Sequence, residues 1–264
     1  MSKKLGLALG AGGARGVAHV GLLRALEEEG IKPDFIAGAS MGAVVGGVYA
    51  SGVSAEKMYE IIKGLKKRDI IGINPAALTQ MAILRSGKVN SLLCEYLAVK
   101  NIEDFPVKFK CVATDLLSGK THIFENGDGA TAIRASSTIP GVFAPVKCED
   151  KLLVDGGCTC RVPVKIVKEM GADVVIAMDV LTNCSQPIED VRSIVNILLR
   201  VYDIMDAQNT ASSLERDGHL CDLLLEPEMK GMSQYIIKDL DRAYEEGYLL
   251  TRQNMDKIKS LLNN

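Results

Sequence analysis

Histidine is scarce in this chain, with three copies among 264 residues, His19, His122 and His219. Histidine is the side chain that most often serves as a general base or a metal ligand, so both roles have few candidates here. Cys158 and Cys160 form a Cys-x-Cys pair, but no second pair and no nearby histidine accompany it. Such a pair alone does not predict a metal site. We therefore expect neither a metal nor a cofactor.

An excess of charge of one sign is also missing. The chain has 31 Lys and Arg against 33 Asp and Glu, a net charge of −2. No large basic field therefore attracts nucleic acid or an anionic membrane. One local basic cluster, residues 63–68, is interpreted as the solvated end of a helix. We expect no nucleic-acid partner, and the oligomeric state is left open.

Long apolar runs are absent from the start of the chain. Residues 1–4 lead directly into an expected strand of about six residues, far shorter than a signal-peptide core or a membrane span. The seven cysteines are an odd number scattered over the chain, which is more typical of a reducing compartment than of a disulfide framework. These features predict a cytoplasmic protein, either free or peripheral to a membrane.

Linkers, internal repeats and low-complexity segments are absent as well, which predicts a single domain over residues 1–264. Apolar strands alternate with helical patterns over residues 4–180. This alternation predicts an α/β fold with three layers, a mainly parallel sheet covered by helices on both faces. The remainder reads mostly as helix, over 191–213 and 239–262, separated by a strand over 219–225.

Glycine, by contrast, is plentiful, and it surrounds a serine in the motif G-x-S-x-G at residues 38–42. The apolar run 34–37 precedes this motif, and a helix of small residues follows it over 43–50. A strand, a sharp turn and a helix in this order expose a serine hydroxyl on a turn too tight for side chains two positions before and after it. The pattern predicts Ser40 as a nucleophile, supported by Gly38 and Gly42.

A second glycine cluster, Gly-Gly-Ala-Arg-Gly at residues 12–16, also lies between an expected strand and an expected helix. Backbone N–H groups at the positive end of a helix suit a negatively charged oxygen. Gly12 and Gly13 are therefore the expected oxyanion-hole residues, with Gly16 supporting the loop. Arg15 either braces the loop or meets a substrate phosphate, and a single loop arginine is more often a brace.

The same loop has a competing interpretation as a dinucleotide-binding fingerprint. Glycines at 10, 12 and 16, after a strand and before a helix, are typical of the turn that binds pyrophosphate in Rossmann domains. The acidic residue expected at the end of the second strand is missing, because the turn around Ser40 occupies that place. A Rossmann-type nucleotide-binding protein remains an alternative.

A serine nucleophile needs a base. The candidates are Asp155 and His219, of which Asp155 is the better one. Asp155 follows the short strand 151–154 and precedes Gly156 and Gly157, so its carboxylate projects from a sharp strand end. In isolation an Asp-Gly pair would indicate a hairpin turn. In elbow-type hydrolases the histidine follows the acid in the chain. Only His219 does so here, and a lone histidine beside a strand is more often a surface residue.

Three blocks, residues 12–16, 38–42 and 155–157, together resemble the motifs of the patatin-like phospholipases, and specifically of the short bacterial members of that family. Residues 135–145 and 171–177 are also similar to the family, so the likeness covers nearly the whole chain.

The resemblance implies a patatin-like serine hydrolase fold and a Ser–Asp dyad without histidine. Ser40 would attack the acyl carbonyl and Asp155 would take its proton. It also implies a lipid or ester substrate, met in solution or at a membrane surface. Residues 70–97 form an apolar stretch that is either ordinary core or a substrate-facing flap. A non-catalytic lipid-binding module on the same fold is the third alternative.

Two positions depart from the family pattern. Ala11 stands where the fullest glycine loops of the family have glycine, and a methyl group fits there if the φ angle is negative. Similar sequences have an asparagine near Cys160 or Arg161, which this chain lacks. That asparagine would brace the turn that carries Asp155.

Overall fold

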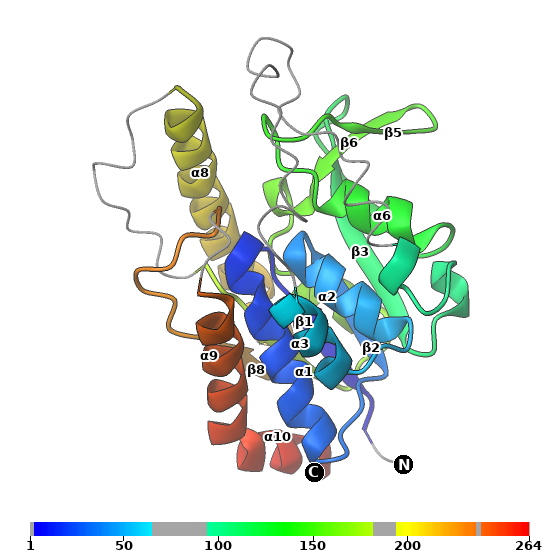
Figure 1. The fold of residues 1–264 in the computed structure, drawn as a ribbon, viewed down its shortest axis with the longest axis vertical. Coiled ribbons are helices and arrows are strands. Elements are labelled where there is room, and N and C mark those ends of the chain that lie inside the picture. The colour runs from blue at the N-terminus through cyan, green and yellow to red at the C-terminus, as the bar shows by residue number, and fades with distance from the viewer. Residues whose placement is uncertain (1–2, 65–93, 182–193, 236–238, 264) are drawn as a thin grey trace.

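A computed structural model describes residues 3–64, 94–181, 194–235 and 239–263 (Figure 1). Residues 65–68 of the basic cluster lie outside the described residues, as does most of the apolar stretch 70–97. Of the helices described, none combines the length and the apolar character needed to cross a bilayer.

The strands of the described chain form one sheet. Its hydrogen-bonded neighbours follow the path β5-β6-β3-β2-β1-β7-β8, and β4 also pairs with β3. The strands β3, β2, β1, β7 and β8 run parallel to one another, whereas β4, β5 and β6 pair in antiparallel fashion. Their bounds are Leu5–Leu9 (β1), Phe35–Ala39 (β2), Lys108–Asp115 (β3), Thr121–Phe124 (β4), Val146–Cys148 (β5), Lys151–Asp155 (β6), Val174–Met178 (β7) and Leu223–Leu225 (β8). The mainly parallel sheet that the sequence predicts is confirmed.

Helices cover both faces of this sheet. Successive side chains of a strand point to opposite faces, and in β1 the residues Leu5, Leu7 and Leu9 join one buried cluster while Ala8 joins another. The first cluster packs against α1, α2, α9 and α10, and the second against α7. The helices are Ala18–Glu28 (α1), Met41–Ala50 (α2), Ala55–Gly64 (α3), Gly129–Ser136 (α6), Val164–Glu169 (α7), Ile194–Asp217 (α8), Leu240–Gln253 (α9) and Met255–Asn263 (α10). The predicted three-layer α/β arrangement is therefore observed.

The expected boundaries in the last third of the chain need correction. The strand expected over 219–225 is only β8, and His219 lies before it in a 3-10 turn, Gly218–Leu220. The strand begins only after Asp222, where the carboxylate accepts the Val175 N–H in place of a backbone carbonyl, while the Asp222 N–H donates to the Val175 carbonyl. The helix expected over 239–262 is two helices. It breaks at Asn254, whose side-chain amide donates to the Leu250 carbonyl and competes with the helical pattern.

The N-terminal and C-terminal parts of the chain are joined where α1 crosses α9. A Cβ atom added to Gly21 would lie 2.2 Å from the Tyr244 carbonyl oxygen, and one added to Gly247 would lie 2.1 Å from that of Ala18. Glycine at both positions lets the two backbones touch. This contact fixes α1, and with it the glycine loop that leads into α1, against a helix more than 200 residues away in sequence.

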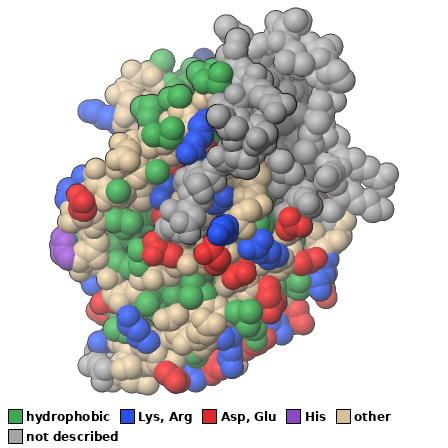
Figure 2. Space-filling model, turned by 90° about the vertical axis from the view of Figure 1, so that its left-hand side faces the viewer, with side chains coloured by type: hydrophobic (Ala, Val, Ile, Leu, Met, Phe, Trp, Pro, Cys, Tyr) green, Lys and Arg blue, Asp and Glu red, His purple; other side chains and the backbone are tan. Residues whose placement is uncertain are grey.

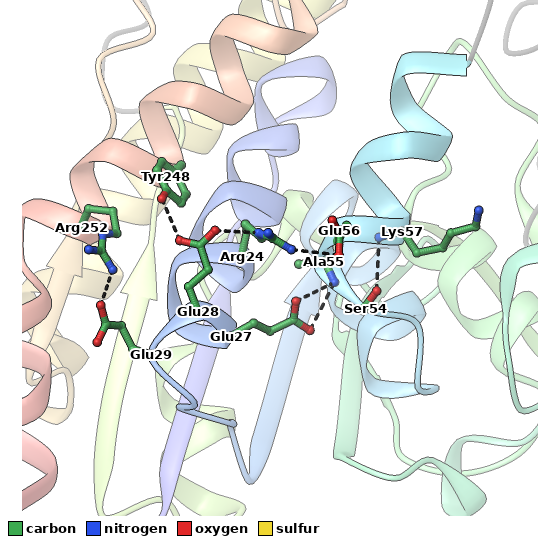
Figure 3. A network of polar contacts seen from close by, with 10 residues as sticks. All are labelled: Arg24, Glu27, Glu28, Glu29, Ser54, Ala55, Glu56, Lys57, Tyr248 and Arg252. Carbon is green, nitrogen blue, oxygen red and sulfur yellow. Dashed lines mark hydrogen bonds and ion pairs between the residues drawn. The ribbon is translucent and has the colours of Figure 1, made fainter.

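Polar side chains border this crossing and extend it to α3 (Figure 3). The Tyr248 hydroxyl of α9 donates to Glu28 of α1 over 2.7 Å. Arg24 bridges Glu28 and Glu56, which ties α1 to α3. Arg252 of α9 pairs with Glu29, just after α1. Surface pairs of this kind contribute little individually, so the backbone contact of the glycines is the stronger constraint.

We expect Gly247→Ala to lower the free energy of unfolding by about 1–3 kcal/mol or more, because the new methyl group has no room against the Ala18 carbonyl. Chemical denaturation monitored by circular dichroism measures the loss. Gly218→Ala is the matched control, since a Cβ atom there meets nothing within 4 Å. Equal stability of the two variants would contradict the close crossing of α1 and α9.

Candidate active site

Ser40 stands on a strained turn between β2 and α2. Its backbone angles are φ 52° and ψ −121°, in a region that residues other than glycine rarely occupy. Such strain is typical of a serine whose hydroxyl is held clear of the strand it follows. A Cβ atom at Gly38 would lie 2.4 Å from the Gly42 carbonyl oxygen, and one at Gly42 would lie 2.1 Å from that of Leu9. Both glycines of the motif are therefore required sterically, as the sequence indicates.

The strand β3 brings Asp155 to this turn. Along one edge β3 pairs with β4, and along its other edge it pairs first with β2 and then with β6. Ala39, the last residue of β2, lies opposite Val112, and Asp155, the last residue of β6, lies opposite Ala113. The strands β2 and β6 thus meet end to end along a single edge. Ser40 and Asp155 occupy the two adjoining ends.

The two side chains are hydrogen-bonded. The Ser40 hydroxyl donates to Oδ2 of Asp155 over 2.5 Å, and Oδ1 of Asp155 accepts the Gly157 N–H over 2.8 Å. The backbone of Asp155 is fixed as well, because its N–H donates to the Thr138 carbonyl and its carbonyl accepts the Thr114 hydroxyl. Both carboxylate oxygens and both backbone groups of Asp155 therefore have partners.

Burial changes the acidity of this carboxyl group. Asp155 is 3% exposed, and desolvation raises its pKa from 3.8 to about 7. The hydrogen bonds from Ser40 and Gly157 lower the pKa, and the nearby charge of Asp206 raises it further. A carboxylate with a pKa near neutrality accepts a proton far more readily than an ordinary aspartate.

The glycine loop lines the same cavity as Ser40 and Asp155. Gly13 has a positive φ of 51°, and a Cβ atom on it would lie 2.2 Å from the Gln234 carbonyl oxygen. That carbonyl accepts the Ala14 N–H over 2.9 Å. Within the described part of the chain, neither the Gly12 nor the Gly13 N–H has a hydrogen-bond acceptor. Both residues line the cavity beside the serine.

Arg15 is not among the residues that line this cavity. Its guanidinium is buried and donates from Nε and Nη2 to the Met232 carbonyl, over 2.9 and 2.5 Å. This geometry agrees with a brace that ties the glycine loop to the segment before α9. A Cβ atom on Gly16 would lie 2.5 Å from Met41 Cγ, so the loop also packs directly against the start of α2.

The two departures from the family pattern are accommodated locally. Ala11 is not among the described residues with positive φ, so its methyl group is unstrained. Its N–H donates to the Arg161 carbonyl over 3.0 Å, which joins the glycine loop to the chain after Asp155. The Arg161 guanidinium is buried and pairs with Asp179 at 2.7 Å and Asp206 at 2.9 Å. The turn after Asp155 is therefore braced by an ion-pair network instead of an asparagine.

The sequence analysis missed the residues that close the cavity. Tyr202 and Asp206 of α8, together with Gln234 and Tyr235, also line it. No motif contains them. The available signal was a pair of aspartates three residues apart, Asp203 and Asp206, within a run of apolar residues. Both aspartates are buried in the structure.

In the part of the chain that the structure describes, none of the three histidines is hydrogen-bonded to Ser40 or Asp155. His19 is buried under the glycine loop, where its Nε2 lies 2.8 Å from the Gly10 carbonyl oxygen and burial lowers its pKa to about 4. His122 stacks edge-on against Phe124 in β4. His219 is exposed. Among the described residues, no three His, Cys, Asp or Glu side chains are grouped so that they could hold a metal ion.

We expect Asp155→Asn to make the protein more stable than the wild type at pH 8, by a few kcal/mol. The folded-state pKa of Asp155 is raised above its unfolded value of 3.8, so the wild type loses stability as the pH rises from about 4 to about 7. Asparagine does not titrate. Its side-chain oxygen can accept the Gly157 N–H, and its amide nitrogen can donate to the Ser40 hydroxyl oxygen, which reverses the direction of that bond. Denaturant titrations of both proteins at pH 4 and pH 8 measure the effect, and a stability difference independent of pH would contradict it.

The chain matches known proteins over most of its length. A sequence model described as patatin-like phospholipase matches residues 7–168. An uncharacterized NTE family protein of Mycobacterium bovis is 40% identical over 189 residues, which are 72% of this chain and 52% of that protein. A lysophospholipase of Emericella nidulans is 29% identical over 98% of this chain and 18% of its own length. The chain thus spans about half of the mycobacterial relative and less of the fungal one.

The fold has a counterpart among solved structures. VipD from Legionella pneumophila superposes with a TM-score of 0.54 at 16% sequence identity, over 97% of this chain and 67% of that one. The likeness at this identity concerns the fold alone. The match of the patatin-like phospholipase model over residues 7–168, more than half of the chain, shows that the chain belongs to the patatin-like phospholipase family.

Proposed function

We propose that this chain is a serine hydrolase of lipid esters that works with a Ser40–Asp155 dyad and no histidine. The observation that carries the proposal is the 2.5 Å hydrogen bond from the Ser40 hydroxyl to a buried carboxylate. The strained backbone of Ser40 and the raised pKa of Asp155 support it, because perturbed groups of this kind cluster at catalytic sites.

The geometry supports a two-step reaction. Asp155 Oδ2 takes the proton of the Ser40 hydroxyl while Oγ attacks the acyl carbonyl. The carbonyl oxygen becomes an alkoxide, which the N–H groups of Gly12 and Gly13 would stabilise. When the ester bond breaks, Asp155 returns the proton to the leaving alcohol. A water molecule then gives a proton to Asp155 while its oxygen attacks the acyl-serine. The bond between the acyl carbon and Oγ breaks, Asp155 returns the proton to Ser40 Oγ, and the fatty acid leaves.

The lipid part of the proposal is supported by descent. The matched family is that of patatin-like phospholipases, and the Emericella relative is named a lysophospholipase. We propose a substrate of the same class, an acyl ester of a phospholipid or lysophospholipid. The site itself selects for an ester carbonyl that reaches Ser40, and its motifs do not distinguish head groups.

The two alternative functions have less support. A dinucleotide site needs an acidic residue at the end of β2 to bind the ribose, and Ser40 occupies that position. A lipid-binding module without catalysis needs no hydrogen-bonded serine and carboxylate. Burial of the Asp155 charge would then lower the stability of the fold and serve no function. A fluorophosphonate probe, which labels an activated serine, separates both alternatives from the hydrolase.

We expect Ser40→Ala to abolish both probe labelling and ester hydrolysis, and Asp155→Asn to lower kcat by about 10³-fold or more. His219→Gln should change kcat less than twofold, because its exposed ring contacts neither dyad residue. Steady-state kinetics with a lysophospholipid and a short-chain ester, together with probe labelling, measure these effects. Circular dichroism controls for folding.

Activity of Ser40→Ala within tenfold of the wild type would overturn the assignment of the nucleophile. A larger loss in His219→Gln than in Asp155→Asn would replace the dyad by a triad. Micromolar binding of a dinucleotide to a wild-type protein without esterase activity would favour the nucleotide-binding alternative.

The pH dependence tests Asp155 as the base. Only the ionised carboxylate accepts the serine proton, so kcat/KM should rise with pH and level off above an apparent pKa of about 7. The charge of Asp206 raises this pKa, so Asp206→Asn should shift the midpoint to lower pH. Asp217→Asn, at the far end of the same helix, is the control and should leave the midpoint in place. A profile that falls through pH 7 would contradict the assignment of the base.

A further inference from the structure

The helix α8 carries its polar and apolar faces the wrong way round for a helix on the surface of a soluble domain. Such helices normally bury an apolar stripe and expose charges. In α8 the buried face carries Asp203, Asp206 and Thr210, which are 3–5% exposed. The opposite face exposes large apolar side chains over its first three described turns. These are Ile197, Leu198, Val201, Ile204 and Met205, which are between 46% and 63% exposed.

The exposed residues form one continuous stripe. Their spacing of i, i+1, i+4, i+7 and i+8 places them along one side of the helix. We call these five residues the α8 stripe. α8 stands at the upper left in Figure 1, and Figure 2 shows apolar side chains gathered near the top of the corresponding face of the molecule. The carboxylates of this part of the helix, Asp203 and Asp206, point inward, so they do not interrupt the stripe.

A second pair of exposed apolar side chains lies at the same end of the molecule. Leu116 and Leu117, which are 50% and 70% exposed, follow β3 at the edge of the sheet where β2 also ends. That edge lies toward the top in Figure 1, as does the first turn of α8. The cavity with Ser40 and Asp155 is lined by Tyr202 and Asp206 of α8 and by Ser40, in the turn that follows β2.

The size of the stripe argues against a second protein molecule as its partner. A stable protein interface takes about 20 to 30 residues from each side, and the stripe supplies five. Shallow insertion into a lipid surface needs only a few apolar side chains on one plane, since each buried group adds its own transfer free energy. The chain has a net charge of −2, so attraction to anionic lipid is not the driving force.

We propose that the α8 stripe docks on the surface of a phospholipid bilayer and that burial of its apolar side chains holds the protein there. This inference rests on the proposed lipid hydrolysis. The inner face of the same helix contributes Tyr202 and Asp206 to the cavity. Docking through the outer face therefore brings the cavity to the layer that supplies the acyl chains, with a single helix separating lipid from the catalytic residues.

The test is sedimentation of the full chain with phosphatidylcholine vesicles. We expect the wild type to bind, and the double variant Leu198→Ser/Met205→Ser to bind at least about tenfold more weakly. Leu249→Ser is the matched control, because Leu249 is 45% exposed on α9 and lies outside the stripe. Adding anionic lipid or raising the salt concentration should change wild-type binding less than twofold.

Hydrolysis separates this proposal from the proposed function. The double variant should hydrolyse a short-chain, water-soluble ester within twofold of the wild type and lose activity on vesicle substrates in proportion to its weaker binding. Wild-type protein that hydrolyses neither substrate would refute the proposed function, while vesicle binding would still test the docking surface.

Three outcomes would overturn the docking proposal. The wild type could fail to sediment with the vesicles. The double variant could bind as well as Leu249→Ser. Analytical ultracentrifugation could show that the wild type is a dimer and the double variant a monomer. A second copy of the chain would then cover the α8 stripe.

Discussion

The candidate site depends on how β3 shares one of its edges between two strands. The strand β2 approaches from one end and β6 from the other, and they stop opposite the neighbouring residues Val112 and Ala113. At that point β2 must turn away, and the turn is Ser40 with a positive φ. β6 must also leave the sheet, and its last residue is Asp155. The 2.5 Å contact between their side chains follows from the pairing register, so a shift of either strand would separate them.

Burial of Asp155 at this junction costs stability and at the same time makes the carboxyl group useful. A buried carboxylate is unfavourable, and desolvation is the main cause that raises its pKa to about 7. The surrounding hydrogen bonds offset only part of this effect. The ion-pair network of Arg161, Asp179 and Asp206 lies beside it, and the Asp206 charge adds to the shift. Stability and basicity at this position are therefore linked, as they often are where activity requires a strained or desolvated group.

Much of this site could be predicted from the sequence, because its parts are local. The motif around Ser40 lies within five residues, and steric crowding at Gly38 and Gly42 leaves a recognisable pattern. The glycine loop and the Asp-Gly-Gly turn are equally compact. The elements that close the cavity could not be predicted, since α8 reaches it through tertiary packing and no motif marks Tyr202 or Asp206. The boundaries near Asp222 and Asn254 were missed for a similar reason, because single side chains hydrogen-bond to the backbone there and shift the ends of the elements.

The buried acids of α8 also explain why its outer face is apolar. The inner face of α8 carries Asp206 and Asp203. Asp206 pairs with Arg161, and Asp203 accepts hydrogen bonds from Gln234 and Tyr235. These buried positions of the inner face therefore do not supply the apolar burial that normally attaches a helix to its domain. Apolar side chains on the outer face are exposed to water, which is unfavourable. They contribute a favourable free energy only when another apolar phase covers them. Under the docking proposal that phase is the lipid bilayer, which would place α8 where the substrate of the proposed hydrolase is found.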